Sequence, residues 1–254
     1  MGKEIASAVL ADAACTLTGC IELPTHQSIG KDYGFLTGLG ISGLMLHGSL
    51  TGLPIDKSVI VDFSARQATL ALLDAVEGRA ARIVIGTTGF SDAETARIRR
   101  AAQAFPIVLS PNMSYGVNLL FALTELAAQK LGDSYDIEIV EAHHRFKKDS
   151  PSGTARKLGE IAAAAIGTTY DDAVRNGRAG MVGERPKKEI GMHAVRGGDI
   201  VGDHTVLFAG PGERIELRHV AHSRATLARG AVVAAKWLAA QRPGLYSMRD
   251  VLGL

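Results

Sequence analysis

The sequence has 254 residues, of which 46% are hydrophobic and 21% charged, and its formal net charge at pH 7 is +2. This composition indicates a folded globular protein of one large domain or two smaller ones, and it argues against disorder. The small net charge favours neither nucleic acid nor an anionic membrane as a partner. No apolar run reaches the roughly 18 residues of a membrane span, and charges at Lys3 and Glu4 interrupt any signal-peptide core. We expect a cytoplasmic protein.

The first half of the chain alternates short apolar strands with amphipathic helices. The pattern predicts helices at 3–14, 65–77, 91–104 and 117–131, and strands at 16–22, 58–63, 82–85 and 107–109. Continuous apolar strands separated by helices indicate a parallel sheet that is covered on both faces. This doubly wound α/β arrangement places ligands at the carboxyl ends of the strands.

After about Met113 the rhythm changes. Strand patterns occur at 135–142, 189–196, 204–209 and 214–221, and helical patterns at 151–166 and 226–240. Consecutive strands with short glycine-containing turns predict a mixed or antiparallel sheet, and hence a second, α+β domain. We expect the last helix to pack back onto the first domain and residues 167–188 to form a loop.

Two cysteines, Cys15 and Cys20, lie five residues apart. A disulfide or a redox pair is one interpretation of this spacing. We expect instead two buried structural thiols, because a reducing cytoplasm disfavours disulfides and free cysteines are usually buried.

The segment 141–154, EAHHRFKKDSPSGT, is the strongest functional signal. Its strand delivers His143 and His144 to one pocket only if it ends there, because adjacent strand residues point to opposite faces. Lys147 follows in a short basic loop. One histidine and Lys147 would bind an acidic group, and the other histidine would titrate near neutral pH and transfer a proton.

A helix start completes this segment. We expect Ser150 as the N-cap and Pro151 as the first helical residue, with Ser152, Gly153 and Thr154 in the first turn. Unpaired N–H groups at a helix start, with a glycine that permits close approach, form a carboxylate site. A solvated basic loop before an ordinary helix is the alternative.

A metal site is a further alternative for the same segment, because Glu141 or Asp149 would complete a ligand set with the two histidines. The adjacent histidines fit poorly, since metalloprotease histidines lie one helical turn apart. We therefore expect no metal ion.

Polar turns follow two predicted strands, and each lies where a doubly wound sheet binds a dinucleotide. The residues concerned are Gly86, Thr87 and Thr88 after one strand, and Ser110, Pro111, Asn112 and Met113 after the next. An ordinary strand-to-helix turn is the alternative for each of them. Glu22 ends the strand 16–22, where an acidic group accepts hydrogen bonds from the adenosine ribose, or is simply exposed. Arg224 would bind a carboxylate or form an ion pair between domains.

The whole sequence resembles the dihydrodipicolinate reductase family, now called 4-hydroxy-tetrahydrodipicolinate reductases, of bacterial lysine and diaminopimelate biosynthesis. The resemblance is carried by VDFS, VIGTTGFS, SPNMSYGVN, DIEIVEAHHRFKKDSPSGTA, RGGDIVGDHTVLFAG and MRDVL, which begin at residues 61, 84, 110, 136, 196 and 248. It implies an oxidoreductase in which NADPH or NADH delivers hydride to a small cyclic imine with two carboxylates. It also implies a homotetramer assembled through the mixed-sheet domain.

The resemblance assigns roles to individual residues. His143 would donate and accept the proton, and Lys147 would be its partner at the reacting carbon–nitrogen system. His144, Gly153 and Thr154 would bind the substrate carboxylates. The turns at 86–88 and 110–113 would contact the nicotinamide cofactor, and Glu22 its ribose. Residues 1–113 and 224–254 would form the dinucleotide-binding domain, and 114–223 the substrate and oligomerisation domain.

The N-terminus departs from the family pattern, which opens with a strand and a turn of the type G-x-x-G-R-M-G. Met1 and Gly2 match the last two residues of that turn. We expect a Rossmann-like domain without its first strand, because the start codon is assigned too late or because the chain is truncated. The alternatives to a reductase of this substrate are therefore a remnant with impaired cofactor binding, or a dehydrogenase of another acidic imine. NADH and NADPH are not distinguished, although Leu23, where some relatives carry arginine, weakens the case for NADPH.

Overall fold

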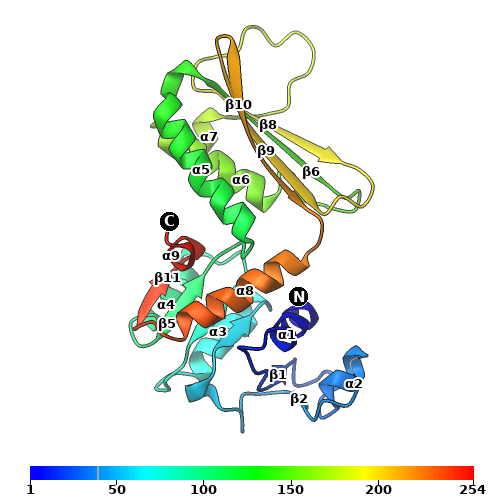
Figure 1. The fold of residues 1–254 in the computed structure, drawn as a ribbon. Helices are drawn as coiled ribbons and strands as arrows, with labels where there is room; N and C mark the ends of the chain where they lie inside the picture. Colours follow the sequence, from blue (N-terminus) through cyan, green and yellow to red (C-terminus); the bar gives the residue numbers. More distant parts are fainter. Residues whose placement is uncertain (39) are drawn as a thin grey trace. The chain divides into compact units, whose positions relative to one another are not determined.

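The computed structural model describes residues 1–38 and 40–254. The chain forms two compact units (Figure 1). Unit 1 comprises Met1–Ser114 and Leu227–Gly253, and unit 2 comprises Tyr115–Thr226. No helix within 1–38 or 40–254 is long and apolar enough to span a membrane.

Unit 1 contains a four-stranded parallel sheet in the order β11-β5-β4-β3. Its strands are β3 (Ile60–Asp62), β4 (Ile83–Ile85), β5 (Pro106–Leu109) and β11 (Gly244–Tyr246). The helices of this unit are α1 (Gly2–Leu10), α2 (Tyr33–Thr37), α3 (Arg66–Ala75), α4 (Asp92–Ala101), α9 (Met248–Leu252) and the short η1 (Ile55–Lys57). The helix α8 (Ala225–Leu238) begins in unit 2 and continues in unit 1.

Both faces of this sheet are covered. Ile83, Ile85 and Ile107 pack against a core that includes residues of α3 and α4. Their neighbours Val84 and Val108 pack on the other face against α8 and Met248. Burying each isoleucine or valine contributes about 1.5–3 kcal/mol, which explains why the strands are continuously apolar. The predicted doubly wound parallel sheet is confirmed.

The predicted strand at 16–22 is much shorter in the structure. It forms only β1 (Cys20–Ile21), which pairs in parallel with β2 (Leu46–His47) in a separate two-stranded sheet. The preceding helix α1 ends at Leu10, earlier than predicted. Cys15 and Cys20 are free thiols, and the expectation that both are buried is wrong because each is partly exposed. Burial is nevertheless sufficient to raise the pKa of Cys20 to about 11.

Unit 2 is a five-stranded mixed sheet in the order β10-β9-β6-β8-β7. The strands are β6 (Asp136–His143), β7 (Val174–Asn176), β8 (Ile190–Arg196), β9 (Gly202–Gly210) and β10 (Glu213–Ala221). The helices are α5 (Tyr115–Leu131), α6 (Gly153–Ala165), α7 (Tyr170–Ala173) and η2 (Gly132–Ser134). Residues of α5 and α6 form one core with Ile137, Ile139 and Ile190 of the sheet. The predicted α+β domain with a mixed sheet is confirmed.

Residues 167–188 are not a continuous loop as predicted. Thr169 caps α7 by accepting a hydrogen bond from the Asp172 backbone, and β7 pairs in parallel with the start of β8. The sequence has little periodicity here because β7 is a short edge strand whose last two residues are exposed. Its structure depends on pairing with β8.

Candidate active site

The strand β6 ends where the two predicted histidines begin. Every second residue of β6 points toward the helix-covered face, and Ile137, Ile139 and Glu141 are buried there. His143 is the last residue of the strand. The backbone then turns, with a hydrogen bond from the Lys147 N–H to the His144 carbonyl. The prediction that the strand ends at this pair is confirmed.

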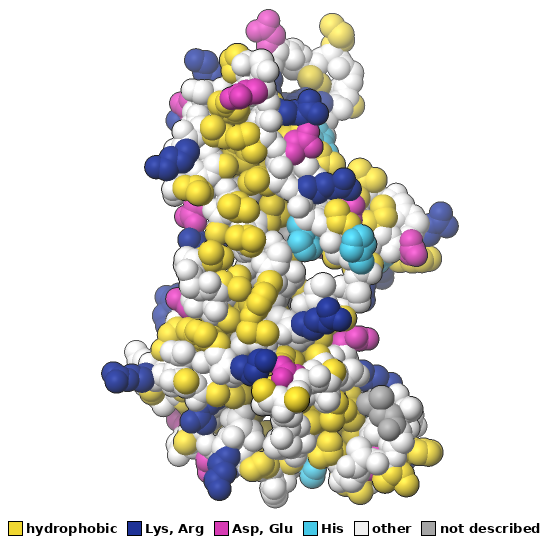
Figure 2. Space-filling view, viewed as in Figure 1, with side chains coloured by type: hydrophobic (Ala, Val, Ile, Leu, Met, Phe, Trp, Pro, Cys, Tyr) yellow, Lys and Arg dark blue, Asp and Glu magenta, His cyan; other side chains and the backbone are white. Residues whose placement is uncertain are grey.

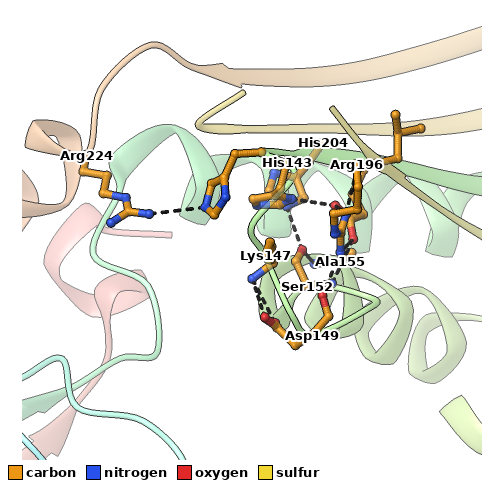
Figure 3. A network of polar contacts seen from close by, with 11 residues as sticks. His143, Lys147, Asp149, Ser152, Ala155, Arg196, His204 and Arg224 are labelled. Carbon is orange, nitrogen blue, oxygen red and sulfur yellow. Dashed lines mark hydrogen bonds and ion pairs between the residues drawn. The ribbon is translucent and has the colours of Figure 1, made fainter. Parts of the chain in front are cut away.

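Glu141 is buried and is the centre of a polar network. Figure 3 shows three of its partners, His143, Arg196 and Ser152. Arg196 donates two hydrogen bonds to it, from Nη1 to Oε2 at 2.9 Å and from Nη2 to Oε1 at 2.8 Å. The Ser152 backbone N–H donates to Oε1 at 3.0 Å, and His143 Nδ1 lies 2.6 Å from Oε2. Burial alone would raise the pKa of Glu141, but the hydrogen bonds from Arg196, His143 and Ser152 lower it overall. Glu141 is therefore an anion at neutral pH.

An ionised carboxylate only accepts hydrogen bonds, so His143 Nδ1 is the donor in this contact. The proton on Nδ1 is therefore retained, and Nε2 is the nitrogen that gains or loses a proton. Burial lowers the pKa of His143, and Glu141 opposes this shift. A Cβ atom at Gly202 would lie 3.0 Å from His143 Nε2, so the glycine leaves space beside that atom.

A third histidine, His204, packs against His143. His204 is buried on β9, and its ring lies edge-on to the His143 ring with centroids 5.2 Å apart. Its Nε2 is 3.1 Å from Ser152 Oγ. Burial, and then the neighbouring His143, lower the pKa of His204 to about 3, so it is neutral when His143 carries a proton.

The helix α6 begins two residues later than predicted. Ser152, not Ser150, is the N-cap, and its hydroxyl accepts a hydrogen bond from the Ala155 N–H at 3.2 Å. Gly153 is the first helical residue, so the expectation that Pro151 occupies this position is wrong. The reason is tertiary, because Ser152 is held by Glu141 through its backbone and by His204 through its hydroxyl.

Lys147, Arg224 and His144 supply further polar contacts near the end of β6 and the loop that follows it. Lys147 forms an ion pair with Asp149, with Nζ at 2.9 Å from each carboxylate oxygen, and this contact lowers the pKa of Asp149. Arg224 Nη2 lies 3.5 Å from His144 Nε2. His144 Nδ1 is buried without a hydrogen-bond partner among the described residues. Within the described ranges no three His, Cys, Asp or Glu residues form a group suited to a metal ion.

The predicted cofactor turns lie at one edge of the sheet in unit 1. Ile85 is opposite Leu109 in the parallel register, so the turns 86–88 and 110–112 follow neighbouring strand ends. Thr88 and Pro111 are exposed there. Thr87 is buried, and its hydroxyl accepts a hydrogen bond from the Ser64 N–H at 3.0 Å.

Three other residues of the predicted cofactor set are engaged within the protein. Ser110 Oγ donates to the Asn112 carbonyl at 2.8 Å. The Met113 side chain is fully buried in the core under α8. The exposed Glu22 lies directly after β1, and its carboxylate accepts a hydrogen bond from the Leu23 N–H at 2.8 Å.

The sequence indicated no role for Arg196 or His204, placed Ser152 only in the first turn of the helix, and indicated Glu141 only as a candidate metal ligand. The segment beginning RGGDIVGDHT contains Arg196 and His204 and contributes to the family resemblance. Nothing local in it indicates that either residue reaches the segment 141–154. Strand pairing produces this contact, since His143 is opposite Arg196 in the β6–β8 register.

Family models match nearly the whole chain. Residues 1–113 match the model described as the N-terminus of dihydrodipicolinate reductase, and residues 116–252 match the model of its C-terminus. The chain is 48% identical over 253 residues to a 4-hydroxy-tetrahydrodipicolinate reductase of Syntrophus aciditrophicus, covering 100% of this chain and 94% of that protein. It is 50% identical over 254 residues to the enzyme of the same name from Thiobacillus denitrificans, covering 100% and 95%.

A solved structure has the same fold. The dipicolinate-bound dihydrodipicolinate reductase from Paenisporosarcina sp. TG-14 is 24% identical and matches with a TM-score of 0.75. The match covers 97% of this chain and 92% of that one. An amine dehydrogenase from Mycobacterium smegmatis matches with a TM-score of 0.57 at 13% identity, over 96% and 91% of the two chains.

Proposed function

The chain belongs to the dihydrodipicolinate reductase family, and we propose that it reduces 4-hydroxy-tetrahydrodipicolinate to tetrahydrodipicolinate in lysine biosynthesis. The reductant is NADH or NADPH. The observation that carries this proposal for the chain's own residues is the hydrogen bond between His143 and the buried, anionic Glu141. It leaves a histidine with one exchangeable nitrogen beside a group of cations.

The substrate-binding role is assigned to residues around the start of α6. Lys147, His144 and Arg224 supply positive charge or hydrogen bonds for the two carboxylates of the substrate. Gly153 is the first helical residue, where a backbone N–H has no partner within the helix. The Thr154 hydroxyl follows in the same turn. Together these groups suit a small, doubly acidic ring and disfavour a neutral one.

Proton transfer is assigned to His143 Nε2. Loss of the 4-hydroxyl group as water would leave a conjugated ring, and the bound dinucleotide would supply hydride to that ring. His143 holds the proton that the ring takes up, and Glu141 stabilises the imidazolium before transfer. Lys147 is the partner of His143 at the reacting carbon–nitrogen bond.

The dinucleotide-binding role is assigned to residues 1–113 and 224–254, and the substrate role to 114–223. The exposed Thr88 and Pro111 at the strand ends of unit 1 fit a ligand in the crevice of a doubly wound sheet. The Thr87 and Met113 side chains are buried, so these two positions would contribute backbone groups. Gly86, Ser110 and Asn112 complete the nicotinamide side, and the exposed Glu22 would accept hydrogen bonds from the ribose.

A cytoplasmic homotetramer assembled through unit 2 is also part of the proposal. The helices α5 and α6 cover one face of the mixed sheet, which leaves the opposite face for subunit contacts. The outer side of α5, on the helix-covered side of the sheet, is a second candidate contact surface and exposes apolar side chains (Figure 2): Tyr115, Leu119, Leu123 and Leu126. Contiguous apolar surface of this kind marks interaction sites.

Cofactor binding and turnover test the proposal. Saturable quenching or enhancement of NADH or NADPH fluorescence should accompany reduction of 4-hydroxy-tetrahydrodipicolinate. His143→Gln should lower kcat by about 10²–10⁴-fold with a much smaller change in KM, because the residue acts on a proton in the transition state. Turnover of a different cyclic imine in preference to this substrate, or no dinucleotide binding, would contradict it.

A further inference from the structure

We infer that Glu141 and Arg196 are positioning residues that fix the tautomer of His143 and set its affinity for the exchanged proton. The inference rests on the proposed function, in which His143 transfers a proton. Neither residue is expected to touch the substrate. Glu141 acts on His143 directly, and Arg196 acts through Glu141.

Glu141 has no freedom to serve any other ligand. It is fully buried, with a side-chain exposure of 0%. One oxygen accepts from Arg196 Nη2 and the Ser152 N–H, and the other from Arg196 Nη1 and His143 Nδ1. A carboxylate with both oxygens engaged in this way is held in one rotamer, so the ring plane of His143 is fixed as well.

Arg196 also ties the site to its loop. Besides the two bonds to Glu141, its Nη2 donates to the Asp149 carbonyl at 2.8 Å. Asp149 is the residue whose carboxylate binds Lys147. The Arg196 guanidinium therefore holds both Glu141, which orients His143, and the backbone of the loop that carries Lys147. A lysine in its place would retain the charge but not the planar, bidentate geometry.

Three charged groups and one neutral histidine face His143, and the charged groups act in opposite directions on its pKa. Glu141, on the same strand, raises it, whereas Lys147 in the loop and Arg196 at the end of β8 lower it. His204 on β9 packs against the ring. Burial itself lowers the pKa of His143. The pKa of His143 is lowered overall, and the carboxylate opposes the lowering by burial, whereas Arg196 adds to it.

The same strand offers a matched control. Glu138 also accepts hydrogen bonds from a histidine, His193 Nε2 at 2.7 Å, and from two arginines, Arg178 and Arg185. Glu138 and Glu141 are three positions apart on β6, so their side chains lie on opposite faces of the sheet. Burial alone would raise the pKa of Glu138, but these hydrogen bonds lower it to about 2. Its chemistry is similar, but it is not bonded to His143.

The test measures the pKa of His143 by NMR titration of imidazole signals in the cofactor-free protein. The chain has 8 histidines, and the His143 signal is identified by its loss in His143→Gln. Glu141→Gln should lower the pKa of His143 by about one unit, and Arg196→Met should raise it by about one unit, because they remove charges of opposite sign. Arg196→Lys, which retains the charge, should leave it close to the wild-type value.

Turnover provides the second readout. Glu141→Gln should lower kcat by about 10- to 100-fold while KM changes by less than about threefold, since the loss concerns proton transfer. The apparent pKa of kcat in each active variant should move in the same direction as the NMR value. Glu138→Gln should change neither the pKa of His143 nor kcat.

The outcomes separate the inference from the proposed function. Folded Glu141→Gln and Arg196→Met variants whose His143 pKa values stay unchanged, or move in the same direction, would overturn the inference. If either variant does not fold, Arg196→Lys decides. A lowered kcat with an unshifted His143 pKa would show that Arg196 acts by orienting Glu141. An unaltered kcat would refute this positioning role. If the variants show the expected changes in the pKa of His143 but the wild-type protein does not reduce the substrate, the proposed function alone is overturned.

Discussion

Replacing Ser152 by alanine should destabilise unit 2 far more than the loss of an ordinary helix cap. The Ser152 hydroxyl caps α6 by accepting from the Ala155 N–H, and it also bonds to His204 Nε2. Both Ser152 and His204 are buried, so water cannot replace the hydroxyl. The substitution therefore removes two interactions, and it leaves a buried ring nitrogen without a partner.

The two losses have separate magnitudes. Removing a serine N-cap costs about 1 kcal/mol. Leaving a buried acceptor unsatisfied costs about 1–3 kcal/mol. The free energy of opening of α6 should therefore fall by about 2–4 kcal/mol. Thr169→Ala is the matched control, because Thr169 caps α7 in the same unit from an exposed position, and its removal should cost only about 1 kcal/mol.

Native-state hydrogen exchange of the α6 amides measures this effect within unit 2. At about 1.4 kcal/mol per factor of ten, Ser152→Ala should accelerate exchange of the best-protected amides by about 30-fold or more. Thr169→Ala should accelerate exchange at α7 by about fivefold. Equal effects of the two substitutions, each at its own helix, would refute the reasoning, because the buried contact with His204 would then contribute nothing.

Three further predictions concern the buried histidine and two close-packed glycines. Burial lowers the pKa of His204 from its ordinary 6.5 to about 3, so between these two pH values only the unfolded chain binds the proton. The free energy of unfolding should therefore fall by about 2 kcal/mol from pH 7.5 to pH 5 through this residue, and His204→Phe should remove that fall. Gly202→Ala should crowd His143 Nε2, at 3.0 Å from the new Cβ, and lower kcat with little effect on stability. Gly230→Ala should lower the stability of unit 1 by about 1–3 kcal/mol and weaken dinucleotide binding, because its Cβ would clash with the Met113 carbonyl.

Each of these has a direct measurement. Urea unfolding at several pH values compares wild type with His204→Phe, and equal pH dependence would contradict the lowered pKa. Steady-state kinetics test Gly202→Ala against Gly197→Ala, since a Cβ at Gly197 meets nothing within 4 Å; equal kcat values would count against crowding of Nε2. Fluorescence of the single tryptophan, which lies on α8, follows unfolding of Gly230→Ala, and an unchanged midpoint would contradict the clash.

The sequence correctly predicted features that depend on residues close together along the chain. The runs around Ile83 and Ile107 are apolar on both faces, and only a strand covered by helices on both sides requires this. The position of His143 and His144 at a strand end also followed from the local pattern. The boundaries of β1 and α7 did not, because a two-residue strand and a four-residue helix are decided by pairing and capping contacts.

By itself, the sequence determined the alternation of helices and strands along the chain, the segment 141–154 and the family resemblance, since each is encoded in contiguous residues. Only the tertiary structure decided which groups control His143. Arg196 lies 55 residues from Glu141, and His204 lies 52 residues from Ser152. Pairing of β6 with β8 and β9 brings them together. Burial then makes their hydrogen bonds strong enough to fix a rotamer and shift a pKa, and no local pattern reports burial.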